Sequence, residues 1–458
     1  MLDKALSYNA ARREANLEGL KEFLRIPSVS TLKQHKPDVA RAANFVVDQL
    51  RSMGFTAVDL IAGAENENPL VKGEWLGAPG KPTVLLYAHY DVQPVDPLNL
   101  WTSAPFEPTV RDGRLFARGS SDDKGQLWIL LKSLESYMKT SGSLPVNVKV
   151  LFEGEEEIGC GHITRYVESK PAYLNDVTSI VVLDSGFYAP GIPTITTGLR
   201  GMVKANITVR TGKQDLHSGV YGGAAPNPLH ALAKIIGELT TDTGRVRVPG
   251  FYKSVQKPSK AECSSWSKLP FDETAFRDEL GAKKLIGDSR YSVLHRTWAR
   301  PTLDVNGMVG GFTGEGFKTV IPAQASAKVS MRLVPGMDPE ATAESFKRYV
   351  QAVTPAYATC DVQILATAPA MLVDTSDKSC DAAAKALKET FKADVAYIRI
   401  GGSIPIAASF QSVLSKPVLV TGFVLPDCQM HAPNENLMIE NMYGGIDAMT
   451  RYFYNLSK

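Results

Sequence analysis

Three short, largely apolar segments, each followed directly by acidic or histidine residues, constrain the fold of this chain more than any other feature. They are TVLLYA at 83–88, VNVKVLF at 146–152 and SIVVL at 179–183. Runs of this kind are typical of strands buried on both faces of a parallel sheet. Between and before them, apolar residues recur with helical spacing at 17–24, 39–53 and 126–138. Strands that alternate with helices predict an α/β fold with a mainly parallel sheet flanked by helices.

The pattern changes near residue 198 and returns near residue 379. Alternation of apolar and polar residues indicates half-exposed strands at 203–210, 325–333 and 361–366, with helical patterns at 228–239 and 339–353. A buried strand is again indicated at 417–420. A chain of 458 residues is expected to form two domains. The sequence therefore predicts a first domain built from 1–200 and 371–458, interrupted by an α+β domain of residues 201–370.

The composition of the chain argues against several classes of partner. The formal net charge is only +2, without a long basic or acidic run, so we expect no nucleic acid and no membrane surface as partner. The five cysteines lack CxxC spacing, which indicates free thiols in a reducing compartment. The N-terminal segment is charged and no run of about eighteen apolar residues follows it, which predicts a cytoplasmic protein.

The residues that follow the predicted strands indicate a metal site. The first strand runs into His89 and Asp91, the second into 153–157 (EGEEE), and the third into Asp184; Asp122 and Asp123 precede a helix. In open α/β sheets the functional crevice lies beyond the carboxyl ends of the strands. A single Asp after a strand is usually a turn or cap residue, and a Glu run is usually solvated. Several carboxylates arriving at one edge repel one another, however, and a bound dication relieves the repulsion.

Nine features in order resemble one family of enzymes. They are AHYDVQP, RGSSDDKG, EGEEEIG, LDSG, DLHSGVYGG, KTVIP, MRLVP, GGSIP and the isolated His431. This order is similar to that of the carnosinase-like metallopeptidases, including the cytosolic non-specific dipeptidases. Their superfamily also contains aminoacylases, acetylornithine deacetylase, succinyl-diaminopimelate desuccinylase and glutamate carboxypeptidases. The resemblance covers residues 85–431 and implies a di-metal peptidase fold, an inserted lid or dimerisation domain, and a homodimer.

The resemblance also implies the ligands of two divalent metal ions per subunit. His89, Asp122 and Asp184 would hold one ion, whereas Asp122, Glu157 and His431 would hold the other, so that Asp122 bridges the pair. This mixture of imidazole and carboxylate suits Zn²⁺ or Mn²⁺, and the sequence does not choose between them. In the family, the two residues that match Asp122 and Asp123 are joined by a cis peptide bond.

Two further residues are predicted to act in catalysis beside the metal ions. Asp91, two residues after His89 and on the same face of an extended strand, is placed to take the second imidazole proton of His89. Glu156 matches the general base of the family. It would take a proton from a water that bridges the metal ions and attacks the amide carbonyl, and then pass it to the leaving amine.

The inserted domain contributes the remaining expected site residues. From the residues alone His217 would be a turn histidine, but the family places it across the subunit boundary, where it stabilises the oxyanion. Arg332 would hold the substrate carboxylate, for which a planar guanidinium is suited. By the same resemblance Thr319, Gly402 and Ser403 would complete the substrate pocket.

Three functions remain open from the sequence. The leading hypothesis is a dipeptidase acting on small peptides, because the region 240–300 is longer than in simpler deacylases of the superfamily. An N-acyl-amino-acid deacylase or a carboxypeptidase with the same metals is the alternative. Ile400 and Ala432 depart from the family pattern near the substrate pocket, and so leave the exact specificity open. A catalytically inactive peptide-binding dimer is the third reading, against which the complete set of ligands and Glu156 argue.

Overall fold

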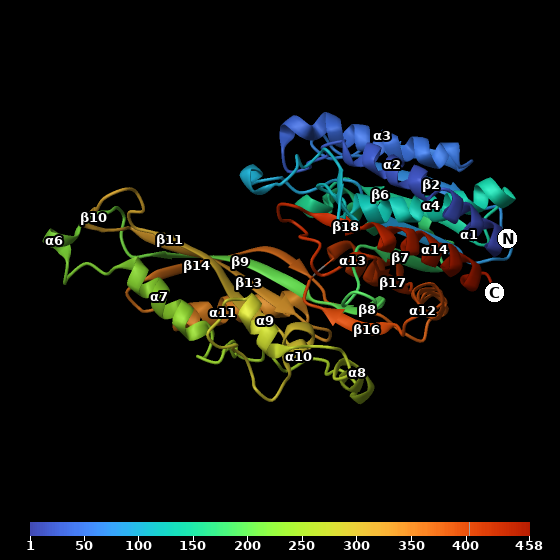
Figure 1. Ribbon diagram of the computed structural model, residues 1–458. Helices are drawn as coiled ribbons and strands as arrows, with labels where there is room; N and C mark the ends of the chain where they lie inside the picture. The colour runs from blue at the N-terminus through green and yellow to red at the C-terminus, as the bar shows by residue number, and fades with distance from the viewer. Residues whose placement is uncertain (403) are drawn as a thin grey trace. The chain divides into compact units, whose positions relative to one another are not determined.

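The computed structural model describes residues 1–402 and 404–458 and divides into two units. The first unit comprises Met1–Thr197, Val373–Ile398 and Pro405–Lys458, and the second comprises Gly198–Leu372 and Arg399–Ile404 (Figure 1). The short segment Arg399–Ile404 was expected in the first domain. It lies with the second unit because Arg200 binds the backbone carbonyls of Gly401 and Gly402, and Arg399 forms an ion pair with Glu262.

The central sheet is mixed, with a parallel core. Its strand order is β1-β2-β6-β3-β7-β17-β8-β15, and β16 pairs with β8. The four central strands β6, β3, β7 and β17 are parallel to one another, whereas β1, β2, β8 and β15 join by antiparallel pairing. The strands are β1 Thr56–Ile61, β2 Leu70–Trp75, β3 Thr83–His89, β6 Asn147–Glu153, β7 Ser179–Leu183, β8 Thr194–Leu199, β15 Met371–Leu372, β16 Ala396–Ile400 and β17 Val418–Thr421.

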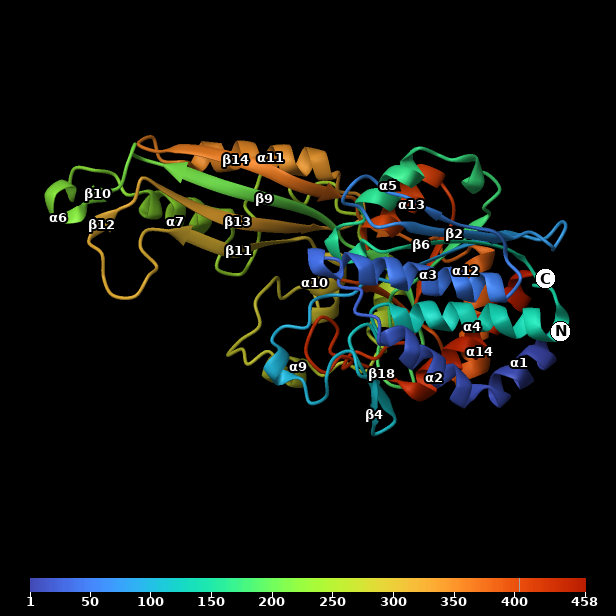
Figure 2. The ribbon, with the colours of Figure 1, turned by 90° about the horizontal axis from the view of Figure 1, so that it is seen from above.

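Helices cover both faces of this sheet, which confirms the predicted α/β class. Figure 2 shows α5 and α13 on one face and α4 and α14 on the other. The helices of the first unit are α1 Leu2–Ala11, α2 Arg13–Leu24, α3 Lys36–Ser52, α4 Lys124–Ser141, α5 Gly161–Glu168, α12 Lys378–Phe391, α13 Pro405–Leu414 and α14 Ile439–Leu456. Helix α4 is buried along most of its length because β3 and the helices α1, α2 and α14 all pack against it. Gly142 caps the C-terminal end of α4, and its φ of 62° is the left-handed conformation that favours glycine.

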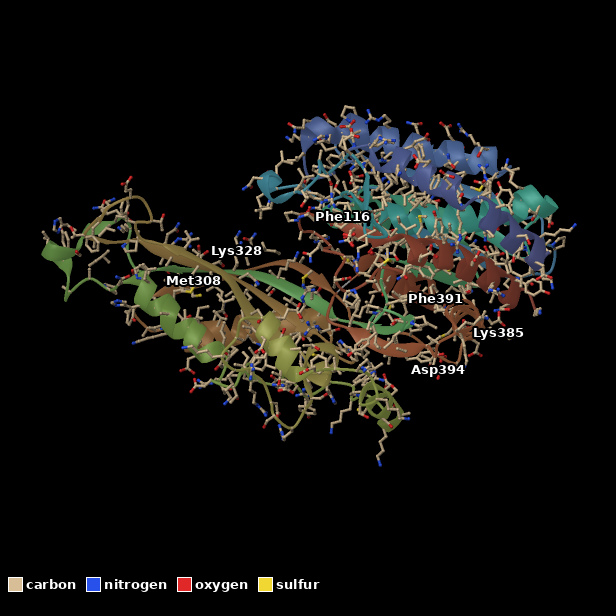
Figure 3. The ribbon with its side chains drawn as sticks, in the orientation of Figure 1. Phe116, Met308, Lys328, Lys385, Phe391 and Asp394 are labelled. Carbon is tan, nitrogen blue, oxygen red and sulfur yellow. The ribbon has the colours of Figure 1, made fainter. Side chains whose placement is uncertain are left out.

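Side chains between the layers form one apolar core in the first unit. Phe391 of α12, labelled in Figure 3, packs edge-on against Phe187 with ring centroids 4.8 Å apart. A small sheet, β18-β5-β4, joins Asn436–Met438 (β18) to Arg114–Phe116 (β5) and Thr109–Arg111 (β4). This pairing brings the segment that follows His431 close to the segment that precedes Asp122.

The second unit is an antiparallel sheet with helices on one face. Its strands β11 Thr302–Gly310, β13 Gln324–Leu333, β9 Gly201–Arg210 and β14 Thr359–Ala368 lie in that order. Alternate residues of β9 and β13 pack with α7 Pro228–Leu239 and α11 Pro339–Val353, as the period-two pattern predicted. The short elements are β10 Leu216–His217, α6 Ser218–Tyr221, β12 Val320–Ile321, α8 Lys260–Trp266, α9 Glu273–Glu279 and α10 Val293–Ala299.

The cysteines and the apolarity of the helices bear on the chain as a whole. The five cysteines are all free thiols, as predicted. Within residues 1–402 and 404–458, no helix combines the length and the apolarity that crossing a membrane requires.

Candidate metal centre

The parallel strands bring the predicted site residues to one edge of the sheet. β3 ends at His89, β7 is followed by Asp184, and β6 is followed by the loop that carries Glu156 and Glu157. Because β3 is parallel to both β6 and β7, the carboxyl ends of the three strands meet. His89 is fully buried, so its imidazole faces an interior that must supply its polar partners.

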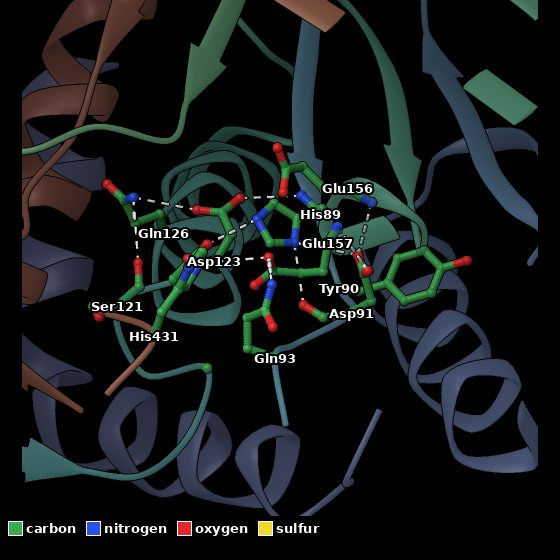
Figure 4. A network of polar contacts seen from close by, with 12 residues as sticks. His89, Tyr90, Asp91, Gln93, Ser121, Asp123, Gln126, Glu156, Glu157 and His431 are labelled. Atoms are coloured by element: carbon green, nitrogen blue, oxygen red, sulfur yellow. Dashed lines mark hydrogen bonds and ion pairs between the residues drawn. The ribbon is translucent and has the colours of Figure 1, made fainter. Parts of the chain in front are cut away.

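Asp122 lies between the two histidines of the site. One oxygen, Oδ1, is 2.9 Å from His89 Nε2, and the other, Oδ2, is 2.8 Å from His431 Nε2. The close-up in Figure 4 shows the His89 ring between His431 and Asp91 in that view. A carboxylate that presents a different oxygen to each of two imidazoles has the arrangement that a bridging ligand needs. The peptide bond between Asp122 and Asp123 is cis, as the resemblance implied.

Two groups of ligand atoms are close enough to hold a metal ion each. The groups are His89, Asp122 and Asp184, and Asp122, Glu157 and His431, with the atoms of each group within 4.8 Å of one another. Glu157 Oε2 is 3.4 Å from His431 Nε2. Ligand atoms bound tetrahedrally at about 2.0–2.1 Å from zinc lie about 3.3 Å apart, so these separations suit a shared ion.

The chemistry of the donor set fits a pair of divalent cations. Three carboxylates and two imidazoles converge, and among the described residues the buried Oε1 of Glu157 has no hydrogen-bond partner. Buried carboxylate oxygens are rarely left unpaired, because desolvation without a compensating partner is costly. Metal ligation supplies such a partner, and imidazole with carboxylate is a donor set typical of Zn²⁺ or Mn²⁺.

The acidity of the carboxyl groups shows the same excess of negative charge. Burial, followed by the neighbouring Asp122, raises the pKa of Asp184 to about 7. Burial, followed by the charges of Asp184 and Asp122, raises the pKa of Glu156 to about 9 against the opposing effect of His89. Burial also acts to raise the pKa of Asp122, but its bonds to His431 and His89 outweigh it and lower that pKa. Bound positive charge would compensate this cluster.

Asp91 has two tasks where the sequence predicted one. His89 Nδ1 is 3.1 Å from the Asp91 carbonyl oxygen and 3.3 Å from its carboxylate Oδ1. Both are acceptors, so Nδ1 carries the proton and Nε2 is left to face Asp122 and a metal. The Asp91 carboxylate also accepts hydrogen bonds from the backbone N–H groups of Glu156, at 3.3 Å, and Glu157, at 3.2 Å. It therefore fixes the start of the short 3₁₀ turn Glu156–Ile158 that carries both glutamates.

Four residues that the sequence did not single out hold the candidate ligands in place. Asp123 accepts from the backbone N–H of His89 at 3.1 Å, and Gln126 donates to Asp123 at 3.2 Å. Gln93 donates to Glu157 Oε2 at 2.6 Å, and Glu435 binds the segment around Asp122. Gln93 and Asp123 stand inside recognised motifs, but a motif does not reveal which side chain an amide or a carboxylate contacts.

The expected site residues of the inserted domain fall into two separate groups. His217 and Thr319 belong to one two-stranded ribbon, in which His217 pairs with Val320 and Ser218 N–H donates to the Thr319 carbonyl at 3.0 Å. Arg332 lies near the other end of β13, close enough to Arg200 for its charge, after burial, to lower the pKa of Arg200 to about 10. Gly402 accepts from Arg200 N–H at 3.1 Å, and Ser403 lies outside the described residues.

The length of β13 separates these two groups within one chain. Ala323, just before β13, donates its N–H to Asp215, the residue before the ribbon strand β10, at 2.9 Å, whereas Arg332 is nine residues further along the extended strand. At about 3.3 Å per residue, the nine residues from Ala323 to Arg332 span about 30 Å. A dipeptide is much shorter, so His217 and Arg332 of a single chain do not reach the same small substrate.

The fold and this cluster of histidine and carboxylate side chains are those of a metallopeptidase. Comparison with known sequences agrees, because the profile of peptidase family M20/M25/M40 matches residues 85–455, and the chain belongs to that family.

Similar proteins cover nearly the whole chain. The Cys-Gly metallodipeptidase DUG1 of Candida albicans is 30% identical, over 96% of this chain and 94% of its own. The Beta-Ala-His dipeptidase of Homo sapiens is 28% identical, over 100% and 93%. The solved structure of the metallo-carboxypeptidase Sso-CP2 from Sulfolobus solfataricus has a TM-score of 0.87 at 30% identity, over 96% and 99%.

Proposed function

We propose that this chain is a dipeptidase that uses two divalent metal ions, Zn²⁺ or Mn²⁺, to hydrolyse the amide bond of small peptides. The observation that carries the proposal is the position of Asp122, which presents one oxygen to His89 and the other to His431. His89, Asp122 and Asp184 would hold one ion, and Asp122, Glu157 and His431 the other. The dipeptidase names of two similar proteins support the substrate class.

The residues around the metal pair have distinct roles in the proposed reaction. Two bound dications would activate a water and polarise the carbonyl of the scissile amide. Glu156 takes a proton from the attacking water and delivers it to the leaving amine nitrogen. Asp91 holds the backbone of Glu156 and keeps the proton of His89 on Nδ1. Arg332, with Gly402 and Ser403, would bind the substrate carboxylate.

Replacement of the proposed base separates proton transfer from metal binding. Glu156→Gln keeps the size of the side chain but removes its ability to accept a proton, so turnover should fall roughly a hundredfold or more. Metal content, measured by elemental analysis, should stay at two ions per chain because Glu156 is not a proposed ligand. Steady-state kinetics on a dipeptide give the first value. Turnover equal to that of the wild type would assign the base to another residue.

The alternative activity is that of a carboxypeptidase or an N-acyl-amino-acid deacylase. The similarity to Sso-CP2, a metallo-carboxypeptidase, favours the first of these. We expect dipeptides to be cleaved at least about tenfold faster, by kcat/KM, than tripeptides or N-acetyl amino acids with the same C-terminal residue. A difference of that size corresponds to about 1.4 kcal/mol in transition-state binding. Mass spectrometry of the products from a matched panel measures it, and faster cleavage of the longer or acylated substrates would select the alternative.

The active form is proposed to be a homodimer with shared sites. The length of β13 supports this arrangement, because about 30 Å of extended strand separates Arg332 from Ala323, which is bonded to Asp215 beside the ribbon that carries His217. If both residues act on one dipeptide, they must come from different chains. Thr319 would then enter the site together with His217, because the same ribbon carries both residues.

A further inference from the structure

Glu435 accepts five hydrogen bonds, although residues 429–434 just before it are exposed or half-buried. Its side chain is fully buried. Oε2 accepts from Arg118 Nη1 at 2.7 Å and from Gly119 N–H at 2.9 Å. Oε1 accepts from Ser121 N–H and Ser121 Oγ, both at 2.9 Å, and from Asp122 N–H at 3.0 Å. Five donors therefore saturate the carboxylate, which leaves it unable to serve as a metal ligand itself.

These bonds join the three segments that carry most of the proposed ligands. The backbone of Asp122 is bound directly, and His431 is only four residues before Glu435 in the sequence. Arg118, the ion-pair partner of Glu435, also donates to the carbonyl of Pro94 at 2.9 Å. Pro94 lies in the irregular segment that follows β3, five residues after His89 and three after Asp91. A single buried carboxylate thus connects the first, second and last ligand-bearing segments.

The segment that bears His431 needs such external support. Three of its non-glycine residues, Gln429, His431 and Asn434, have positive φ values of 57°, 60° and 64°. Side chains disfavour this left-handed conformation, so it persists only where surrounding contacts impose it. The Asn434 side chain bonds to the backbone of Thr102 and Leu100, and Glu435 supplies the buried contacts.

We propose that Glu435 is a positioning residue that holds Asp122 and His431 in the geometry of the metal pair and thereby sets the affinity of the site for its dications. This inference rests on the proposed metal centre. Glu435 acts through the backbone of the bridging ligand, not through contact with a metal or a substrate. Outer groups that orient metal ligands commonly change metal affinity tenfold to a hundredfold when they are lost.

Glu435→Gln is the informative substitution because it changes bonding without changing size. The carboxylate accepts from donors on both oxygens, whereas an amide places an NH₂ group against one set of those donors. The amide accepts hydrogen bonds through one oxygen only, and its NH₂ group then faces donors that the second carboxylate oxygen had accepted. Glu435→Asp keeps the charge and both acceptor oxygens but withdraws them by one methylene, so it should restore part of the wild-type behaviour.

Glu135→Gln is the matched control for the loss of a buried carboxylate. Glu135 accepts from Tyr8 and Lys132 and is also buried, but it stands eleven residues into α4 from Lys124, about 16 Å along the helix. Its replacement should lower the melting temperature without changing metal binding. This variant therefore tests whether a loss of stability alone, without a change near the metal centre, weakens metal binding.

The experiment titrates the metal-free full-length proteins with Co²⁺ and follows the visible absorption of the bound ion and the stoichiometry. We expect the wild-type chain to bind two Co²⁺. Glu435→Gln should bind Co²⁺ at least tenfold more weakly and with an altered absorption spectrum. Glu435→Asp should have an intermediate affinity, and Glu135→Gln the wild-type affinity. Wild-type affinity and spectrum in Glu435→Gln, or an equal loss in Glu135→Gln, would overturn the inference alone. A wild-type chain that binds no Co²⁺ would overturn the metal centre as well. Should Glu435→Gln fail to fold, the comparison of Glu435→Asp with Glu135→Gln decides by the same criterion.

Discussion

Asp122→Ala is expected to lose both metal ions, not one, and to lose nearly all peptidase activity. Asp122 Oδ1 lies beside His89 and Oδ2 beside His431, so Asp122 would help to hold both the ion proposed for His89 and Asp184 and the ion proposed for Glu157 and His431. Each ion would then keep only two protein ligands, and catalytic zinc sites ordinarily have three. Turnover should therefore fall by more than the roughly hundredfold that the loss of an outer contact costs.

Elemental analysis of purified, dialysed protein measures this result, and Asp184→Ala provides the contrast. Asp184 is a proposed ligand of one ion only, so its replacement should leave about one metal ion per chain, whereas Asp122→Ala should leave none. Circular dichroism and thermal melting establish that both variants are folded. Two equivalents of metal retained by Asp122→Ala would refute the bridging role.

The strands that carry the site were predictable because burial on both faces leaves a clear signature. Every residue of β3, β6 and β7 is buried, and each appears in the sequence as a largely apolar run. β1 and β11 were not predicted because each has only one buried residue, Val58 and Leu303 respectively, and so shows neither an apolar run nor regular alternation. Such flanking strands depend on pairing with neighbours, which local pattern does not encode. The predicted runs form the parallel centre of the sheet, and strands of weaker pattern flank that centre by antiparallel pairing.

Some residues of the candidate site were also predictable from local sequence pattern, whereas others depend on contacts between distant parts of the chain. His89, Glu157 and Asp184 follow predicted strands, so the meeting of strand ends was enough to place them together. His431 lies in an irregular segment, and only the resemblance singled it out. Glu435 gave no signal because its role depends on contacts more than 300 residues away along the chain. The sequence therefore indicates which groups could bind metal, whereas the residues that hold those groups become visible only in the folded structure.

His217→Ala is expected to be nearly inactive while keeping both metal ions. His217 Nδ1 accepts a hydrogen bond from Gly219 N–H at 3.0 Å, which leaves the proton of the neutral imidazole on Nε2. The imidazole is exposed, so this N–H is able to donate to a developing oxyanion. Loss of one such donor commonly lowers the rate about a hundredfold to a thousandfold. Steady-state kinetics and elemental analysis of the variant give the two values.

Complementation then tests whether His217 acts in the neighbouring subunit. His217→Ala is mixed with Glu156→Ala, which lacks the base but keeps His217, and the subunits are allowed to exchange. In a mixed dimer one site combines the intact Glu156 of one chain with the intact His217 of the other. Random exchange makes about half of the dimers mixed, each with one of two sites restored, so about a quarter of wild-type activity should return. A chain that carries both substitutions, mixed with His217→Ala, restores no site and provides the control. If verified exchange brings no recovery, His217 acts within its own chain or not at all, and the separation of His217 from Arg332 along β13 would then exclude one of them from the substrate.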